Sequence, residues 1–377
     1  MTKTRVVSFM TRGAAAALLA LAAIPASAQR YIPHNLVSDE PGLAAFTDPN
    51  LVNAWGIASS GSGPIWIANN GSGTSTIYHG NGTPLPLVVT IPAGAANTEG
   101  AVPTGLVFNA TGQFMVTENS VSGSAVFIFA GEDGTISGWN PSVDATHAIL
   151  PASADLSASG AVFKGLALGS TGSGNFLYAT DFHDGFVQVF DSTFTPTTTF
   201  TDSSLTALGF APFGIANIGG NLYVSFAKQD ADAHDDVAGA GNGYVDEFDT
   251  SGTLIRQFAA QGALNSPWGM VLAPGNFGAF AGAILVGNFG DGRINAFDPS
   301  TGDFLGQMLL PSGQPLVIDG LWGLRFGNGG SGGSTNLLFF TSGPDGESHG
   351  LFGSIRAIPA VAGVPAPARA AIVHGRR

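Results

Sequence analysis

One short phrase recurs six times along this chain of 377 residues. In general an apolar or aromatic residue precedes a glycine, and two or three mostly apolar residues follow it, as in AWGIA (54–58) and PWGMVL (267–272). The six glycines are Gly56, Gly105, Gly165, Gly214, Gly269 and Gly323. Chance explains one such match in a glycine-rich chain, but not six in near-even register with similar sequels. A phrase that recurs at roughly even spacing along a chain indicates a repeat architecture, in which each repeat is one supersecondary unit.

Each phrase is followed by further strand-like runs that are separated by turn residues. In the first repeat these runs are PIWIANN (64–70), STIYHGNGT (75–83) and LPLVVTI (85–91). In the second repeat we expect QFMVTEN (113–119) to be the second strand and AVFIFAGEDGT (125–135) the third. Units of about 40–55 residues with four short strands are typical of propeller blades. The sequence therefore predicts an all-β fold, a six-bladed β-propeller of four-stranded antiparallel blades.

The last repeat lacks an outer strand of its own. GSIRAI (353–358) supplies its third strand, but the Pro/Ala-rich run that follows is no strand sequence. At the other end, RYIPHNLVSD (30–39) is strand-like and belongs to no repeat. We therefore expect the N-terminal strand to complete the last blade, which closes the ring and removes two exposed sheet edges.

Two terminal segments are predicted to lie outside the propeller, which we place at residues 30–358. Residues 1–28 have a basic start and an apolar run that ends in Ala-Ser-Ala, the pattern of a cleaved signal peptide. The mature chain is therefore expected to have no membrane span and to be exported, to the periplasm or the extracellular space. Residues 359–377 are rich in proline and alanine, and we expect them to be disordered.

The charge balance narrows the class of partner. The chain has 26 acidic and 13 basic residues, for a formal net charge of −13. Such a surface repels phosphate backbones, so we expect no nucleic-acid partner and a preference for cations or neutral ligands. The absence of cysteine excludes a cysteine-ligated metal and thiol chemistry. We expect neither a nucleotide nor a haem cofactor, and we expect a monomer.

Polar side chains gather in the loops between the second and third strands. In a propeller these loops open on one face near the channel, which is where six-bladed enzymes bind metal and substrate. The residues assigned to this ligand-binding face are Asn69, Asn70, Glu118, Asn119, Asp181, His183, Asp184, Asn288 and Asp291. The last repeat adds Asp345, Glu347 and His349 to the same face. Turns such as Asp133-Gly134 are assigned to the opposite face, as ordinary hairpin turns.

The fourth repeat carries an acidic insertion, QDADAHDDVAGAGNG (229–243). Its candidate metal ligands are Asp230, Asp232, His234, Asp235 and Asp236. Several carboxylates in one short loop suit Ca²⁺, and the histidine widens the choice to zinc or another divalent cation. Two other interpretations stay open: a solvated acidic loop, and direct acid–base catalysis.

Two smaller groups also have alternative interpretations. Asp181, His183 and Asp184 can form a carboxylate–imidazole pair for base catalysis or metal ligation, or can simply cap a polar loop. The tryptophans Trp55 and Trp268 start innermost strands, and Trp322 does so as well. We expect them to pack between blades, the alternative being a stacking surface for a sugar or a lactone at the channel mouth.

The motifs NAWGI (53–57), AKQDADAHDDVAGAGNGYVDEFD (227–249) and SPWGM (266–270) resemble a family of bacterial secreted propeller proteins. That family is catalogued as conserved hypothetical and is linked in part to PEP-CTERM sorting. The resemblance spans about residues 31–358 and implies a six-bladed propeller and export, but no catalytic residues. At the level of the fold, the blades are also similar to NHL-type propellers and calcium lactonases.

Two functions are consistent with these residues. The first is an exported binding or scaffold protein whose acidic, cation-binding face recognises a small molecule, a glycan or an envelope protein. The second is a Ca²⁺-dependent hydrolase or lactonase that acts at the channel mouth, where the cation polarises an ester carbonyl. The concentration of acids in one insertion favours binding, because calcium lactonases draw their ligands from several blades.

Overall fold

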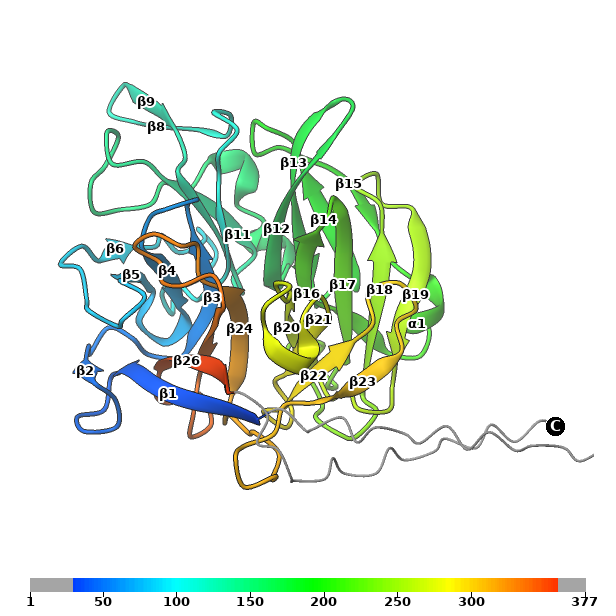
Figure 1. The fold of residues 1–377 in the computed structure, drawn as a ribbon. Coiled ribbons are helices and arrows are strands. Elements are labelled where there is room, and N and C mark those ends of the chain that lie inside the picture. The colour runs from blue at the N-terminus through cyan, green and yellow to red at the C-terminus, as the bar shows by residue number, and fades with distance from the viewer. Residues whose placement is uncertain (1–29, 359–377) are drawn as a thin grey trace, which may run out of the picture. The chain divides into compact units, whose positions relative to one another are not determined.

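The computed structural model describes residues 30–358, which form six sheets arranged as blades and one separate two-stranded hairpin (Figure 1). The innermost strand of each sheet carries the recurring glycine and contacts the innermost strands of the two neighbouring sheets, in cyclic order. The sheets therefore surround a central channel. This is a six-bladed β-propeller, as the repeats predict.

Four blades follow chain order from the channel outward. Blade one is β3 (Ala54–Ser59), β4 (Ile65–Asn69), β5 (Thr74–Tyr78) and β6 (Val89–Thr90). Blade three is β12 (Phe163–Thr171), β13 (Gly174–Asp181), β14 (Phe186–Phe190) and β15 (Pro196–Phe200). Blade four is β16 (Phe210–Ile218), β17 (Asn221–Lys228), β18 (Gly243–Phe248) and β19 (Leu254–Ala260). Blade five is β20 (Pro267–Leu272), β21 (Ile284–Asn288), β22 (Ile294–Phe297) and β23 (Phe304–Gln307).

Blade six is closed by the N-terminal strand. Its strands are β24 (Leu321–Phe326), β25 (Leu337–Ser342), β26 (Leu351–Ile358) and, outermost, β1 (Arg30–Ser38), to which the short β2 (Phe46–Thr47) adds in parallel. The strand β1 pairs antiparallel with β26 from Arg30↔Ile358 to Ser38↔Leu351. The predicted closure is confirmed.

The recurring glycine is required because neighbouring inner strands touch at that position. A Cβ atom on Gly56 would lie 2.4 Å from the carbonyl oxygen of Thr104 in the next blade, and one on Gly214 would lie 2.2 Å from that of Trp268. Real Cβ atoms do not approach backbone atoms so closely, so a larger residue would push the strands apart. The hydroxyl of Thr180 ties two blades together by donating to the Phe213 carbonyl at 2.7 Å.

Blade two differs from the prediction. The run 113–119 is not its second strand, because β8 (Met115–Glu118) pairs with β9 (Val121–Ser124) in a separate hairpin. The blade consists of β7 (Pro103–Phe108), β10 (Phe127–Gly131) and β11 (Thr135–Trp139), and the segment at Ile149 exchanges backbone hydrogen bonds with Gly138 at its outer edge. AVFIFAG is thus the second strand rather than the third.

Because β10 is the second strand of blade two and not the third, the loops of this blade lie at the opposite ends from those predicted. We call the end of the channel that holds the loops 70–73, 132–134, 182–185, 229–242, 289–293 and 343–350 the acidic face, and the other end the far face. Gly131 pairs with Pro103, where β7 begins, whereas Phe127 pairs with Phe108, where β7 ends. The turn after Gly131 therefore lies on the acidic face, and the insertion that contains β8 and β9 lies on the far face.

Helical structure in the described residues is confined to short turns. These are α1 (Ser203–Thr206) and the 3₁₀ turns η1 (Asn70–Ser72), η2 (Ala152–Ala154), η3 (Ser157–Ser159) and η4 (Gly278–Phe280). Between residues 30 and 358, no helix has the length and apolarity that crossing a membrane requires. The predicted signal peptide (1–28) and the predicted disordered tail (359–377) lie outside the described residues.

Candidate functional site

The channel is filled by aromatic side chains next to the recurring glycines. Trp55 of blade one stacks on Trp322 of blade six with ring centroids 3.5 Å apart, and both meet the edge of Trp268 of blade five. Phe182 and Phe213 belong to the same buried cluster. Because blades one and five are not neighbours, these rings meet across the channel. All three tryptophans are buried, and Trp322 contacts one tryptophan from each neighbouring blade, so the expected packing between blades is confirmed and it extends across the channel.

In one of the six repeats, the residue before the recurring glycine is a lysine. The residue before the glycine is tryptophan in three blades, phenylalanine in one and threonine in one, but it is Lys164 in blade three. The Lys164 side chain is only 2% exposed, and its Nζ lies 5.4 Å from the centroid of the Trp55 ring. Its ammonium group contacts Glu132 Oε1 and lies 3.1 Å from Asp235 Oδ1. Burial alone would lower the pKa of Lys164, but the charges of Glu132 and Asp235 outweigh it and raise the pKa. Lys164 is therefore a buried cation held between two carboxylates.

Glu132 is positioned by the β10–β11 turn and by a chain of amides. Its Oε2 accepts a hydrogen bond from Asn70 Nδ2 at 2.6 Å. Asn53 donates to Asn70 Oδ1 at 3.2 Å and to Glu347 Oε1 at 3.1 Å, and it accepts from Trp55 Nε1 at 2.9 Å. Burial raises the pKa of Glu347 to about 7, and the negative charge of Glu132 adds to the shift. The network therefore places a carboxyl group that titrates near neutral pH beside the Lys164 ion pair.

The acidic insertion folds over this network. Asp230 shapes its turn, since its Oδ1 accepts from the backbone N–H of His234 at 3.0 Å and its own N–H donates to the Asp235 carbonyl at 2.8 Å. His234 Nδ1 lies 3.1 Å from Asp235 Oδ1. That hydrogen bond raises the pKa of His234, and together with the charge of Lys164 it holds the pKa of Asp235 well below its usual range.

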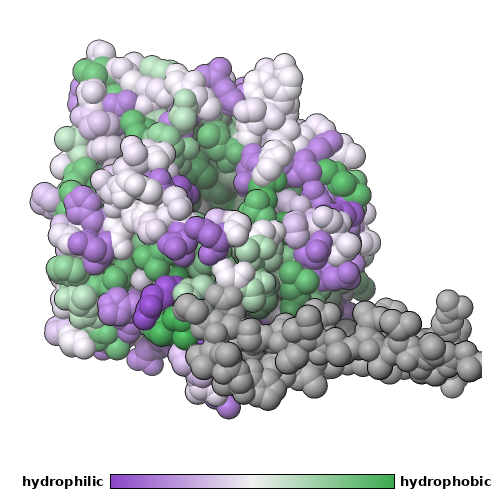
Figure 2. All heavy atoms as spheres, in the orientation of Figure 1, coloured by the Kyte–Doolittle hydropathy of each residue, from purple (hydrophilic) through white to green (hydrophobic). Residues whose placement is uncertain are grey.

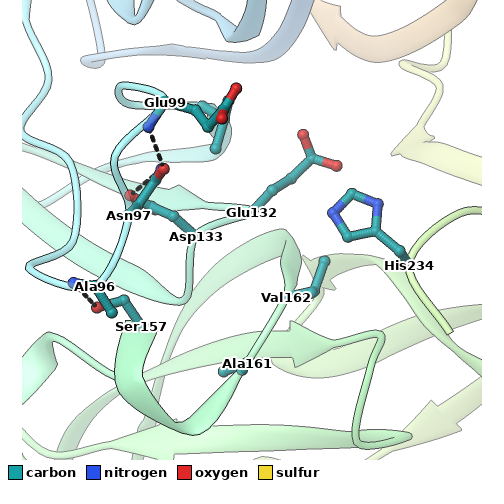
Figure 3. Close-up of a pocket in the computed structure, with 11 residues that line it drawn as sticks. Ala96, Asn97, Glu99, Glu132, Asp133, Ser157, Ala161, Val162 and His234 are labelled. Atoms are coloured by element: carbon teal, nitrogen blue, oxygen red, sulfur yellow. Dashed lines mark hydrogen bonds between the residues drawn. The ribbon is translucent and has the colours of Figure 1, made fainter. Parts of the chain in front are cut away.

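Three side chains converge where the insertion meets blade two. Ligand atoms of Glu132, His234 and Asp235 all lie within 4.8 Å of one another, which is close enough for a shared metal ion. Beside them is a pocket of about 350 Å³. Glu132 and His234 point toward one another at one side of it, and Asn97, Glu99 and Asp133 lie at the other side (Figure 3). Among the described residues, Glu132, His234 and Asp235 form the group of acidic and histidine side chains that lie close enough together to hold a metal ion.

Of the five candidate metal ligands of the insertion, the structure brings two into the convergent group and leaves three outside it. His234 and Asp235 join the convergent group, and Asp230 is used in the turn. Asp232 is exposed and does not belong to the convergent group. Asp236 is partly buried, and burial raises the pKa of its carboxyl group.

Other predicted residues of the ligand-binding face make hydrogen bonds to nearby residues and so stabilise the loops that carry them. Asn69 donates to Thr76 Oγ1 at 3.0 Å, and Asn288 donates to the Ala263 carbonyl at 2.8 Å and to Asp291 Oδ1 at 3.0 Å. Asp181 is buried and accepts from the backbone N–H groups of Val162 and Asp184, at 3.1 and 3.2 Å. Burial raises its pKa to about 6.

Several candidates do not reach the convergent group. His183 and Asp184 are exposed in the β13–β14 loop. His349 lies 2.9 Å from Asp39 Oδ2, so it pairs with the end of β1. Glu118 and Asn119 form the tip of the β8–β9 hairpin on the far face, which corrects their assignment to the acidic face. That assignment failed because it took β8 for the second strand of blade two.

Sequence reasoning missed Glu132 and Lys164. Glu132 was hidden by the same strand assignment, which placed the GEDG turn on the wrong face. Lys164 left a readable signal, since FKGLAL (163–168) has a cation at a position that is aromatic in four of the six repeats.

Comparison with other proteins places the chain in a family. No family model matches it. The uncharacterised protein R648 of Acanthamoeba polyphaga mimivirus is 39% identical over 326 residues, which cover 85% of this chain and 78% of R648. This chain belongs to the R648 family. A second mimivirus protein of the family, the uncharacterised L690, is 35% identical over 298 residues, or 77% of each chain. These relatives are viral, so the bacterial, secreted and PEP-CTERM features of the resemblance stay predictions.

Solved structures share the fold of this R648-family chain at low identity. A streptogramin B lyase has a TM-score of 0.51 at 13% identity, covering 88% of this chain and 98% of the lyase. The soluble aldose sugar dehydrogenase of Escherichia coli has a TM-score of 0.51 at 12% identity, covering 86% and 99%. Identities this low support the propeller fold and nothing about chemistry.

Proposed function

We propose that this chain is an exported propeller that binds a divalent cation between Glu132, His234 and Asp235, and that the cation and the adjacent pocket capture a small polar ligand. The observation that carries this proposal is the convergence of ligands from two blades that are distant in sequence. Two carboxylates and one imidazole suit a first-row transition-metal ion such as Zn²⁺ or Mn²⁺ better than Ca²⁺, which prefers oxygen ligands alone.

The charge of the site supports a bound cation. Glu132 and Asp235 together carry two negative charges, and Lys164 neutralises one of them. Lys164 contacts one oxygen of each carboxylate, Oε1 of Glu132 and Oδ1 of Asp235. Oε2 of Glu132 accepts one hydrogen bond, from Asn70, and keeps a second lone pair for a cation, while Oδ2 of Asp235 and Nε2 of His234 take part in none of the contacts above. A bound ion would sit beside the pocket of about 350 Å³, which is large enough for a small ligand.

Calorimetric titration of the mature chain tests cation binding. We expect one Zn²⁺ or Mn²⁺ per chain, with affinity weakened at least about tenfold by His234→Ala, because the imidazole is a direct ligand. The matched control is Asp232→Asn, which removes a charge from the same insertion outside the convergent group and should leave the affinity unchanged. Equal affinities for wild type and His234→Ala would contradict the proposed site.

One observation favours a second function, metal-assisted hydrolysis of an ester or lactone. Glu347 lies in the same hydrogen-bond network, and its pKa of about 7 suits a group that takes and returns protons near neutral pH. In that role a cation would polarise the carbonyl of the substrate, and Glu347 would serve as the base for the attacking water.

A screen of lactones and esters over pH 5–9 tests this second function. Because the base must be ionised, the rate should rise as the pH passes through about 7 and should level off above it. Glu347→Gln should remove both the rate and its pH dependence, while Zn²⁺ binding remains. The absence of turnover in Zn²⁺-loaded wild type, or turnover in Glu347→Gln with the same pH profile, would exclude this role.

A further inference from the structure

The far face carries a second cavity that no step above uses. It has a volume of about 660 Å³ and is lined by the inner strands of all six blades, beyond the recurring glycines. Each blade contributes at least one large apolar residue to the lining, among them Ile57, Leu106, Leu166, Ile215, Met270 and Leu324, and polar groups make up about half of the lining surface. Figure 2 shows the surface hollowed over the inner strands, with hydrophobic residues at the depth of the hollow. The cavity lies within the range of volumes that small-molecule sites have.

Arg325 is the one charged side chain among the residues that line this cavity. Its Nε donates to Ser59 Oγ and its Nη2 to the Ser59 carbonyl, both at 3.0 Å. Among the described residues, no carboxylate lies within ion-pair distance of the guanidinium, and no hydrogen bond involves Nη1. Burial lowers the pKa of Arg325, with no acidic group to offset it. Arg325 is partly exposed to a cavity whose lining is as much polar as apolar, and its guanidinium has no carboxylate partner, so a ligand carboxylate can supply one.

We propose that the far-face cavity binds an amphipathic anion, a small molecule with an apolar body and one carboxylate that pairs with Arg325. The apolar part of the lining receives the body of the ligand, and the guanidinium receives the head group through charge-assisted hydrogen bonds. The formal net charge of the chain is −13, so the overall field does not attract anions. Selectivity for an anion therefore has to come from direct contact with Arg325.

This site is separate from the cation site of the acidic face. The aromatic cluster of Trp55, Trp268, Trp322, Phe182 and Phe213 fills the channel at the level of the glycines. Lys164 contacts this cluster through the face of the Trp55 ring, and its ammonium group binds the acidic network. A ligand in the far-face cavity therefore does not touch Glu132 or His234, and the two proposals can fail independently.

Calorimetry with decanoate as the probe tests the proposal, with decanol and decyltrimethylammonium as neutral and cationic probes of the same chain length. We expect one decanoate per chain, bound at least about tenfold more tightly than either comparison probe, because only the anion pairs with Arg325. Arg325→Gln should abolish this preference. Arg356→Gln, the same change at an exposed position on β26 outside the cavity, should not affect binding.

Two further variants keep the test decisive if Arg325→Gln does not fold. Asn217 lines the cavity and is exposed, so Asn217→Trp narrows the cavity without changing its charge and should prevent binding of decanoate. His234→Ala should leave decanoate binding unchanged, since it acts on the other face. No measurable decanoate binding, equal affinities for decanoate and decanol, or decanoate binding that persists in Asn217→Trp would each overturn the proposal.

Discussion

Replacement of Lys164 by methionine is expected to destabilise the fold by about 3–5 kcal/mol, because it leaves a largely buried carboxylate without its cation. Glu132 is only 11% exposed and would retain a single hydrogen bond, from Asn70. Asp235 is 67% exposed, so water screens its charge and its share of the loss is small. Since domains of this kind are stable by about 5–15 kcal/mol, urea unfolding monitored by circular dichroism will resolve the change.

The double variant Lys164→Met/Glu132→Gln is the matched control for this experiment. It removes both charges and keeps the shapes of the side chains, so at least half of the lost stability should return. A single variant as stable as wild type, or a double variant no more stable than the single one, would show that the Lys164–Glu132 pair does not carry this stability.

The same variant also tests the proposed cation site. Without the ammonium group, Glu132 and Asp235 keep both negative charges, so Zn²⁺ should raise the melting temperature of Lys164→Met more than that of wild type. Adding His234→Ala should cancel this difference. An equal rise in both proteins would mean that Zn²⁺ does not bind at these carboxylates.

Removal of the N-terminal strand is expected to prevent folding of the isolated chain. A protein that begins at residue 40 loses all of β1 and its antiparallel ladder with β26. It also loses Tyr31, Leu36 and Val37, all of which are at most 5% exposed. Burial of each of these side chains contributes roughly 1.5–3 kcal/mol, which together approaches the whole stability of a domain. The measurements are circular dichroism and gel filtration, with the chain that begins at Gln29 as the reference.

Complementation distinguishes a missing strand from general damage. A synthetic peptide of residues 29–40 should bind the truncated chain and restore its propeller signal, because the edge of β26 and the vacant core positions are complementary to it. The same peptide with Val37 replaced by aspartate should fail, since that side chain is fully buried. A truncated chain that folds without the peptide would contradict the proposed role of β1.

Some residues of the acidic face can be assigned from their position in the repeat alone, and others only once it is known which strands pair. Asn69, Asp181 and Asn288 are each the last residue of the second strand of a blade, and so they lie at the start of acidic-face loops as predicted. Glu132 required knowledge of which strand β10 pairs with, because Gly131↔Pro103 decides the face of its turn. In blade two an insertion with strand-like residues takes the place of a tight turn, and hydrophobic pattern does not distinguish a blade strand from a hairpin strand.

The sequence by itself determined the number of blades, their order and the closure by the first strand. They follow from the regular recurrence of one phrase and from the close contact of the inner strands, which leaves no room for a Cβ atom at five of the six recurring glycines. Tertiary structure alone decided which side chains share a site. Lys164, Glu132 and Asp235 come from three different blades, and their contact depends on how loops fold over a ring, which no periodic pattern encodes.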